Sequence, residues 1–177
     1  MLLGCAAVFL LFIHVTRSDD VDGTDVAPGT GADVGRGIVQ PVKLADDAQQ
    51  ERVAAQLDAA TEMVTAFVNF DYKNPDATIE AVRERSTGTF LEQYQKGATD
   101  LKKLATEAQS TMVARVVWAG LVAGDDDSAT VIVATSGNVT NKTTKFQEEA
   151  RNYRIQVELV LDDGAWLTND LQYVELG

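Results

Sequence analysis

Between residues 44 and 108, hydrophobic residues recur every three or four positions, which is the spacing of amphipathic helices. The pattern predicts a helix over residues 44–70, a short helix over 77–85 and a third helix over 90–108. The first break falls at residues 71–75, where Pro75 disfavours a continuing helix. The side chains expected to face a common core are Val53, Leu57, Met63, Val64, Phe67, Val68, Ile79, Val82, Phe90, Tyr94, Leu101, Leu104 and Ala108.

After Ser110 the period changes to two, the pattern of β-strands. Strands are predicted over residues 111–123, 129–134, 153–161 and 166–176, with turns at 124–127 and 162–164 and a polar loop over 135–151. Strands that follow one another through short turns form an antiparallel meander, and the helices must cover one face of it. The predicted fold class is α+β: three N-terminal helices packed on a curved four-stranded antiparallel sheet, as in NTF2-like and cystatin-like domains.

The chain before this domain divides into an apolar and an acidic segment. Residues 1–17 are interpreted as a transmembrane anchor that is truncated at its N-terminus, because a helix of this length spans only about 25 Å of a roughly 30 Å hydrocarbon core. The apolar part of a signal peptide, a buried soluble helix and lipidation at Cys5 are the alternatives. Residues 18–43, rich in Gly and Asp, predict a flexible linker. Residues 44–177 would then form an extracytoplasmic domain.

Composition narrows the classes of function. The chain has 177 residues, enough for one domain with attachments, and a net charge of -12, which disfavours binding to nucleic acid. Its one Cys and one His exclude an internal disulfide framework and a Cys-built metal site, and make a Ser-His-Asp triad improbable. We therefore predict no cofactor, no metal and no catalytic residue.

Several short motifs occur in a characteristic order. They are Val64-Thr-Ala-Phe-Val-Asn-Phe-Asp-Tyr72, Ser86-Thr-Gly-Thr-Phe90, Leu101-Lys-Lys-Leu104, the turn and strand over residues 124–134, and Asp163-Gly-Ala-Trp-Leu-Thr-Asn-Asp-Leu171. Together with the anchor and the linker, this ensemble over residues 44–174 resembles the Mce-associated membrane proteins of actinobacteria. The chain departs from that pattern in its short anchor.

The resemblance implies a single-pass protein of the cell membrane with an extracytoplasmic NTF2-like or VirB8-like domain. Members of the family are associated with Mce lipid-import assemblies of the cell envelope, as accessory or stabilising subunits. The expected partners are therefore Mce proteins and their permease, with the membrane contacted through the N-terminal helix. Two other hypotheses stay open: a module that binds an apolar small molecule or lipid, and a small NTF2-like enzyme.

An enzyme of the ketosteroid-isomerase type would need a carboxylate and a phenol inside an apolar cavity. The candidates are Tyr72, Tyr94, Tyr153 and Tyr173, with Asp71, Asp100 and Asp170 as partners. Tyr94 and Tyr153 stand at core spacing, which favours a structural role, and we predict that the chain is not an enzyme.

Two further features each allow two interpretations. The run Asp125-Asp126-Asp127 has the oxygen ligands that hard cations prefer, but its position between two strands favours an exposed hairpin turn. Trp118 and Trp166 could anchor an interface or close the core, and the core is favoured for both.

Overall fold

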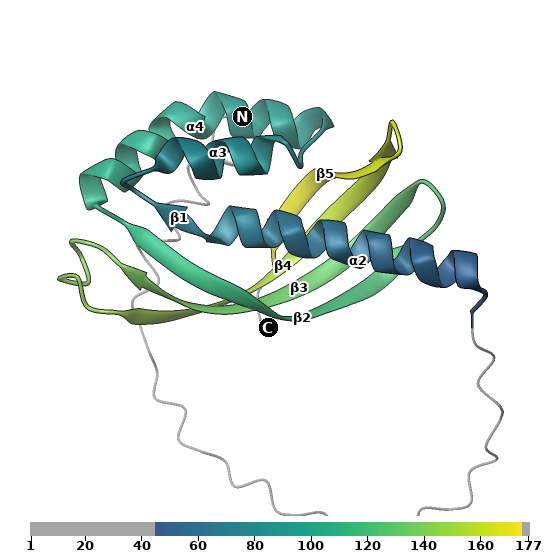
Figure 1. Ribbon diagram of the computed structural model, residues 1–177. Coiled ribbons are helices and arrows are strands. Elements are labelled where there is room, and N and C mark those ends of the chain that lie inside the picture. Colours follow the sequence, from purple (N-terminus) through teal and green to yellow (C-terminus); the bar gives the residue numbers. More distant parts are fainter. Residues whose placement is uncertain (1–44, 175–177) are drawn as a thin grey trace, which may run out of the picture.

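The computed structural model describes residues 45–174, which form three helices on one sheet (Figure 1). The elements are α2 (Asp47–Val68), β1 (Phe70–Asp71), α3 (Pro75–Arg83), α4 (Gly88–Ala108), β2 (Thr111–Gly124), β3 (Ser128–Thr140), β4 (Glu149–Asp162) and β5 (Ala165–Tyr173). The α+β class and the order of helices before the main strands are confirmed. The predicted anchor, residues 1–17, and linker, residues 18–43, lie outside the described residues. None of the helices in the described part has the length and apolar character needed to cross a membrane.

The sheet has five strands rather than the four predicted, in the order β1-β2-β3-β4-β5, and every neighbouring pair is antiparallel. The additional strand is β1, which pairs Phe70 with Met112 and Asp71 with Thr111. A strand of two residues is too short to show a period in the sequence, so this segment was assigned to the end of a helix. Helix α2 ends at Val68 instead.

Strand β3 continues to Thr140, so the predicted loop over residues 135–151 is reduced to residues 141–148. A loop was predicted here because Ser136 and Asn138 are polar. In the structure both residues lie on β3, at alternate positions that pair with β4. The turn between β4 and β5 is confirmed: Asp163 and Gly164 have φ values of 48° and 82°, as a two-residue hairpin turn of type I′ requires.

Helix α2 lies along the inner face of the sheet (Figure 1) and contributes the buried Ala60, Val64 and Val68 to the core. Its buried side chains contact strands β2, β3 and β4 through Met112, Val131, Val133, Val139, Ile155, Val157 and Leu159. A second cluster of Met63, Val82 and Tyr94 joins α2 to α3 and α4. Most of the predicted helix faces are confirmed, but Leu104 is 36% exposed and Ala105 is buried in its place. The second cluster therefore packs α3 and α4 against α2.

Candidate functional site

Three aromatic side chains on the inner face form the part of the domain where an NTF2-like active site would be sought. Phe67 of α2 lies 6.3 Å from Tyr173 of β5, and Tyr153 of β4 lies 5.3 Å from Tyr173, measured between ring centroids. Burial raises the pKa of Tyr173, and the neighbouring Tyr153 adds to this effect. Burial likewise raises the pKa of Tyr153, which Arg151 partly opposes. Both phenols are therefore protonated at neutral pH.

Two hydroxyl groups in this region are buried without a hydrogen-bond partner among the described residues. They are Oη of Tyr173 and Oγ1 of Thr135. Thr135 lies directly across from Tyr153 in the pairing of β3 with β4, so both belong to the inner face. Sequence reasoning singled out the tyrosines but not Thr135, because the predicted strand ended at residue 134 and Thr135 was placed in the polar loop that follows it.

The structure does not bring the candidate carboxylates to these inner-face tyrosines. Asp71 lies at the sheet edge and accepts hydrogen bonds from the backbone N–H of Lys73 and from Oγ1 of Thr111. Asp100 is exposed on α4, and Asp170 pairs with Glu158 on the outer face of β4 and β5. The carboxylate–phenol arrangement of a ketosteroid-isomerase site is therefore not assembled from these residues.

The two remaining tyrosines, Tyr94 and Tyr72, contact neighbouring side chains outside the aromatic group of the inner face. Tyr94 is 8% exposed and stacks on Phe90 at 6.0 Å, which confirms its place in the core. Tyr72 lies near the end of β1, with the ammonium group of Lys73 over its ring at 5.8 Å. Neither tyrosine lies in the aromatic group of the inner face.

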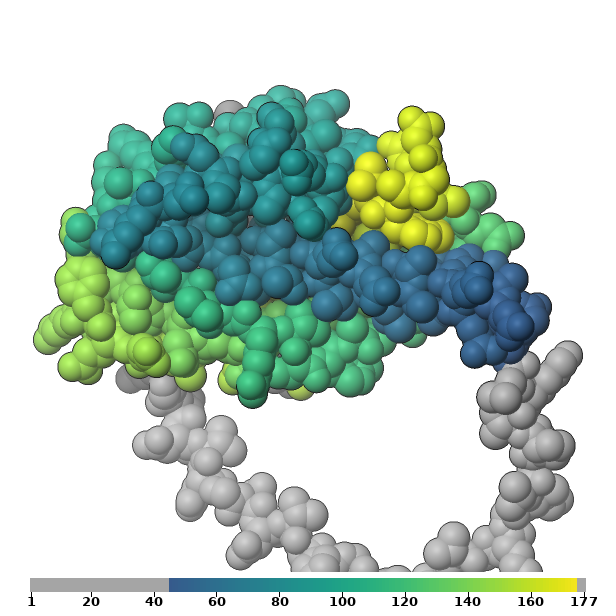
Figure 2. All heavy atoms as spheres, viewed as in Figure 1, coloured from purple at the N-terminus to yellow at the C-terminus, as the bar shows by residue number. Residues whose placement is uncertain are grey.

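Two hollows on the surface of the part that the structure describes are not lined by the inner-face tyrosines. One, of about 320 Å³, lies on the outer side of β2 and β3 and is lined by Thr111, Val113, Asn138, Thr140 and Glu148. The other, of about 270 Å³, lies between α2 and α3 and is lined by Thr61, Glu62, Thr65, Ala66, Ala81 and Arg85. In the view of Figure 2 the helices and the sheet pack closely against one another.

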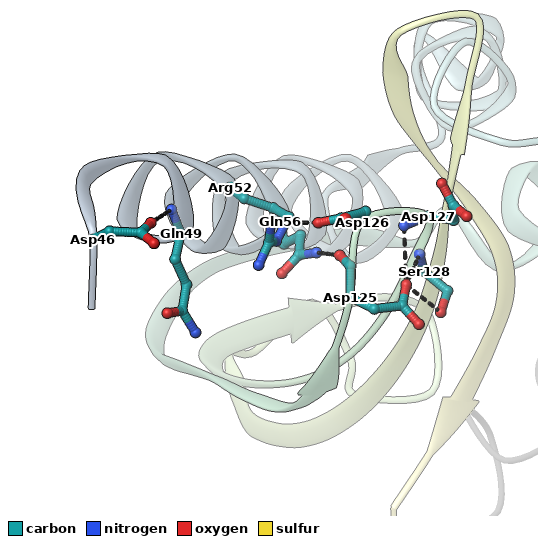
Figure 3. A network of polar contacts seen from close by, with 8 residues as sticks. All are labelled: Asp46, Gln49, Arg52, Gln56, Asp125, Asp126, Asp127 and Ser128. Carbon is teal, nitrogen blue, oxygen red and sulfur yellow. Dashed lines mark hydrogen bonds and ion pairs between the residues drawn. The ribbon is translucent and has the colours of Figure 1, made fainter. Parts of the chain in front are cut away.

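The acidic run Asp125-Asp126-Asp127 forms the turn between β2 and β3, as predicted (Figure 3). The carboxylate of Asp125 accepts hydrogen bonds from the backbone N–H groups of Asp127 and Ser128 at 2.9 and 2.7 Å, which lower the pKa of Asp125. The backbone N–H groups of the turn thus stabilise the ionised form of the Asp125 carboxyl group. The described residues contain no group of His, Cys, Asp or Glu side chains that could hold a metal ion.

Helix α2 fastens this turn to the rest of the domain (Figure 3). Arg52 forms an ion pair with Asp126, and Nε2 of Gln56 donates to the backbone oxygen of Asp125 at 2.9 Å. Gln56 is fully buried although it is polar, because the turn supplies this acceptor. The network places the start of α2 beside the end of β2.

The two tryptophans have different surroundings. Trp166 packs against the core, as predicted, but Trp118 is 57% exposed on the outer face of β2, so its assignment to the core was wrong. Bulges at Val117 and Val122 break the alternation of β2, and these two valines are also exposed. The ring of Trp118 covers Gly120, where a Cβ atom would lie 2.4 Å from Cη2 of the ring. The sequence shows only an unbroken apolar run here, which predicted burial.

The fold is similar to NTF2-like and VirB8-like domains, as two solved structures show. An IcmL-like type IV secretion system protein of Legionella pneumophila superposes with a TM-score of 0.57 at 16% identity, over 75% of this chain and 95% of that chain. CagV of Helicobacter pylori, a VirB8 homologue, gives a TM-score of 0.54 at 9% identity, over 70% of this chain and 99% of that chain. At these identities the likeness concerns the fold.

Sequence comparison defines the family. A family model described as uncharacterized protein Rv1363c/MT1408-like matches residues 38–175, and the chain belongs to this family. The relative Rv1363c of Mycobacterium tuberculosis is 25% identical over 71% of this chain, which spans about half (48%) of that protein's length. The outer membrane protein Rv1973 of the same organism is 26% identical over 74% of this chain and 83% of its own length.

Proposed function

We propose that this chain is a non-catalytic cell-envelope protein whose folded domain is an accessory or stabilising subunit of an Mce-type lipid-import complex. The observation that carries this proposal is the filled interior of the domain. Binding sites for small molecules are concave pockets that are largely pre-formed before the ligand binds. Here the inner face is occupied by the domain's own side chains, among them the fully buried Met63, Val64, Val131 and Ile155. The domain would therefore bind its partners through its outer surface.

The placement of the candidate carboxylates supports a role without catalysis. A ketosteroid-isomerase-type site needs a carboxylate base beside a protonated phenol, and the protonated Tyr153 and Tyr173 could supply only the phenol. Asp71, Asp100 and Asp170, which could have acted as bases, lie elsewhere on the domain. The domain would therefore act by contact with other proteins.

Similar proteins support a place in the cell envelope. One relative is named an outer membrane protein, and both structural neighbours described above are components of type IV secretion systems by name or homology. The resemblance to Mce-associated proteins makes Mce subunits and their permease the expected partners. In this proposal residues 1–17 anchor the chain in the membrane as a single pass, and residues 44–177 form the extracytoplasmic domain.

The experiment that tests this role measures how much Mce protein and permease is present in host membranes. Deleting the gene for this chain should lower the abundance of these subunits, and expressing the full chain should restore it. The variant Tyr173→Phe should restore it equally well, since the phenol takes no part in the function. Unchanged abundance of every Mce and permease subunit in the deletion strain would overturn the stabilising role.

A second candidate function is the binding of an apolar small molecule or lipid. The observation that favours it is that Oγ1 of Thr135 and Oη of Tyr173 are buried without partners among the described residues, with the Tyr173 ring 6.3 Å from that of Phe67. A ligand with a polar group on one of these hydroxyls would displace side chains that fill the inner face and place its apolar part against the aromatic rings. Native mass spectrometry of the full chain purified from its host tests this function. A mass adduct that disappears in the double variant Thr135→Val, Tyr173→Phe supports it, and an unliganded chain contradicts it.

A further inference from the structure

Strand β2 is paired along its whole length on one side and along only a small part of the other. On the first side it pairs with β3 from Thr111 to Gly124. On the other side β1 covers only Thr111 and Met112, and the side chain of Asn69 covers Ala114. From Val116 to Gly124 this side of β2 has no strand partner among the described residues, and we call it the free edge.

The free edge lacks the charges and prolines that commonly prevent pairing of edge strands. Natural edge strands carry charged residues, proline or bulges, and the sequence from Val116 to Gly124, Val-Val-Trp-Ala-Gly-Leu-Val-Ala-Gly, has bulges at Val117 and Val122 but no charged residue and no proline. Three large side chains are exposed along it: Val117 at 53%, Trp118 at 57% and Val122 at 61%. The two bulges leave a regular segment between them, from Trp118 to Leu121. Such an edge is a template for another strand.

The charges at the two ends of the free edge complement each other. Arg115 lies just before its first residue and is exposed, and its side chain forms no hydrogen bond or ion pair within the described part of the chain. The acidic turn over residues 125–127 follows its last residue, and the carboxylate of Asp127 is likewise without a partner there. Arg52 and Gln56 hold this turn in place. The charges of the free edge would therefore be matched best by an antiparallel strand whose C-terminal end is acidic, because that end would lie opposite Arg115.

A second copy of the chain meets this requirement. We propose that two copies associate through their free edges, antiparallel, about a two-fold axis between Ala119 and Gly120. In this register the regular segments from Trp118 to Leu121 lie opposite each other, and Arg115 of one copy lies opposite Gly124 of the other, next to its acidic turn. The same contact occurs twice, because a two-fold interface is self-complementary and closes on itself. The two five-stranded sheets become one continuous sheet.

The pairing also accounts for the exposed tryptophan. The ring of Trp118 lies over Gly120, beside the axis, so the two rings come together on the outer face of the joined sheet. Apolar contact is needed, because each chain carries a net charge of -12 and the two copies repel each other at long range. The dimer is inferred from the edge alone and does not depend on the proposed role in lipid import.

Sedimentation of the full chain, purified in mild detergent, tests the dimer. The wild type is expected to be dimeric, and Trp118→Lys or Val122→Lys, which place a charge in the seam, should give monomers. Leu104→Lys is the matched control, because Leu104 is also an exposed hydrophobic residue but lies on α4. Circular dichroism confirms that each variant is folded. A monomeric wild type at every concentration, or a dimer that Trp118→Lys leaves unchanged, would overturn the proposal.

A charge exchange tests the register. Arg115→Glu should weaken dimerisation by about tenfold, since it replaces attraction to the other copy's acidic turn by repulsion at both ends of the seam, and Asp127→Arg, which reverses a charge of that turn, should weaken it likewise. The double variant should recover most of the loss. If both single variants dissociate but the double variant does not recover, the antiparallel register is wrong.

Discussion

The side-chain amide of Asn69 pairs with the backbone of Ala114 as a strand residue would. Nδ2 of Asn69 donates to the oxygen of Ala114 at 3.0 Å, and Oδ1 accepts from its N–H at 2.9 Å. The same Nδ2 donates to the oxygen of Thr65 in the last turn of α2. Asn69 therefore joins the end of α2 to β2 and extends the short pairing made by β1. Beyond it the free edge begins.

Replacing Asn69 tests this connection. Asn69→Ala leaves the N–H and C=O of Ala114 without partners, and we expect the free energy of unfolding to fall by about 1–3 kcal/mol. Urea denaturation measures the change. Asn152→Ala is the control: Asn152 is exposed on β4, so its loss should change stability by less than about 0.5 kcal/mol. Equal effects of the two substitutions would show that the Asn69 pairing contributes nothing.

Gln56 is expected to be a sensitive position, because it is fully buried and its Oε1 has no partner among the described residues. Gln56→Glu keeps the shape but buries a carboxylate, and should cost about 3 kcal/mol at neutral pH. Burial raises the pKa of such a carboxyl in the folded state, so the loss should grow as pH rises above the unfolded value and diminish in acid. Gln49→Glu, in the exposed first turn of α2, is the control and should show no such dependence.

Asp125 should stabilise the protein in a pH-dependent manner. Because the backbone N–H groups of Asp127 and Ser128 lower its pKa in the folded state, its contribution is present above the ordinary value of 3.8. The contribution is lost as pH falls through the lowered pKa. Asp125→Asn should therefore destabilise the protein at neutral pH and approach the wild type below about pH 4. Thermal melts across this range measure the difference, and a gap that stays constant with pH would contradict the assignment.

Tyr173→Phe should leave the free energy of unfolding unchanged or raise it by up to about 1 kcal/mol, because the hydroxyl is buried without a partner. The raised pKa of Tyr173 adds a second expectation. Wild-type stability is fully present below the ordinary tyrosine value of 10.0 and falls as pH rises above it, and the variant should lose less there. Denaturation at neutral and alkaline pH checks both. A destabilised variant at neutral pH would mean that the hydroxyl has a bound partner.

Much of the fold could be predicted from the sequence, since periodicity reports which side chains are buried. Helix α2 and strand β4 have long amphipathic patterns, and both were found close to their true positions. Strand β1 was missed because its pairing depends on β2, which is distant in the sequence. The exposure of Trp118 was missed because a bulge changes the face of a strand without changing its composition. Burial of Gln56 depends on an acceptor in a distant turn.

The candidate site could be predicted less well than the fold. The sequence supplied tyrosines and carboxylates without their relative positions in space, although alternation along the last strand places Asp170 and Tyr173 on opposite faces, as the register confirms. The free edge of β2 was not recognised, because an edge strand and a central strand can have the same apolar sequence. Which strands end a sheet is decided by the complete topology.

The proposed role in an Mce-type complex is tested most directly by affinity purification of the tagged full-length chain from detergent-solubilised host membranes, followed by quantitative mass spectrometry. Mce proteins and permease should be enriched with the full chain, and this enrichment should be lost when residues 1–17 or residues 44–177 are deleted. Tyr173→Phe should retain it. Recovery of the chain without any Mce or permease subunit would contradict the account.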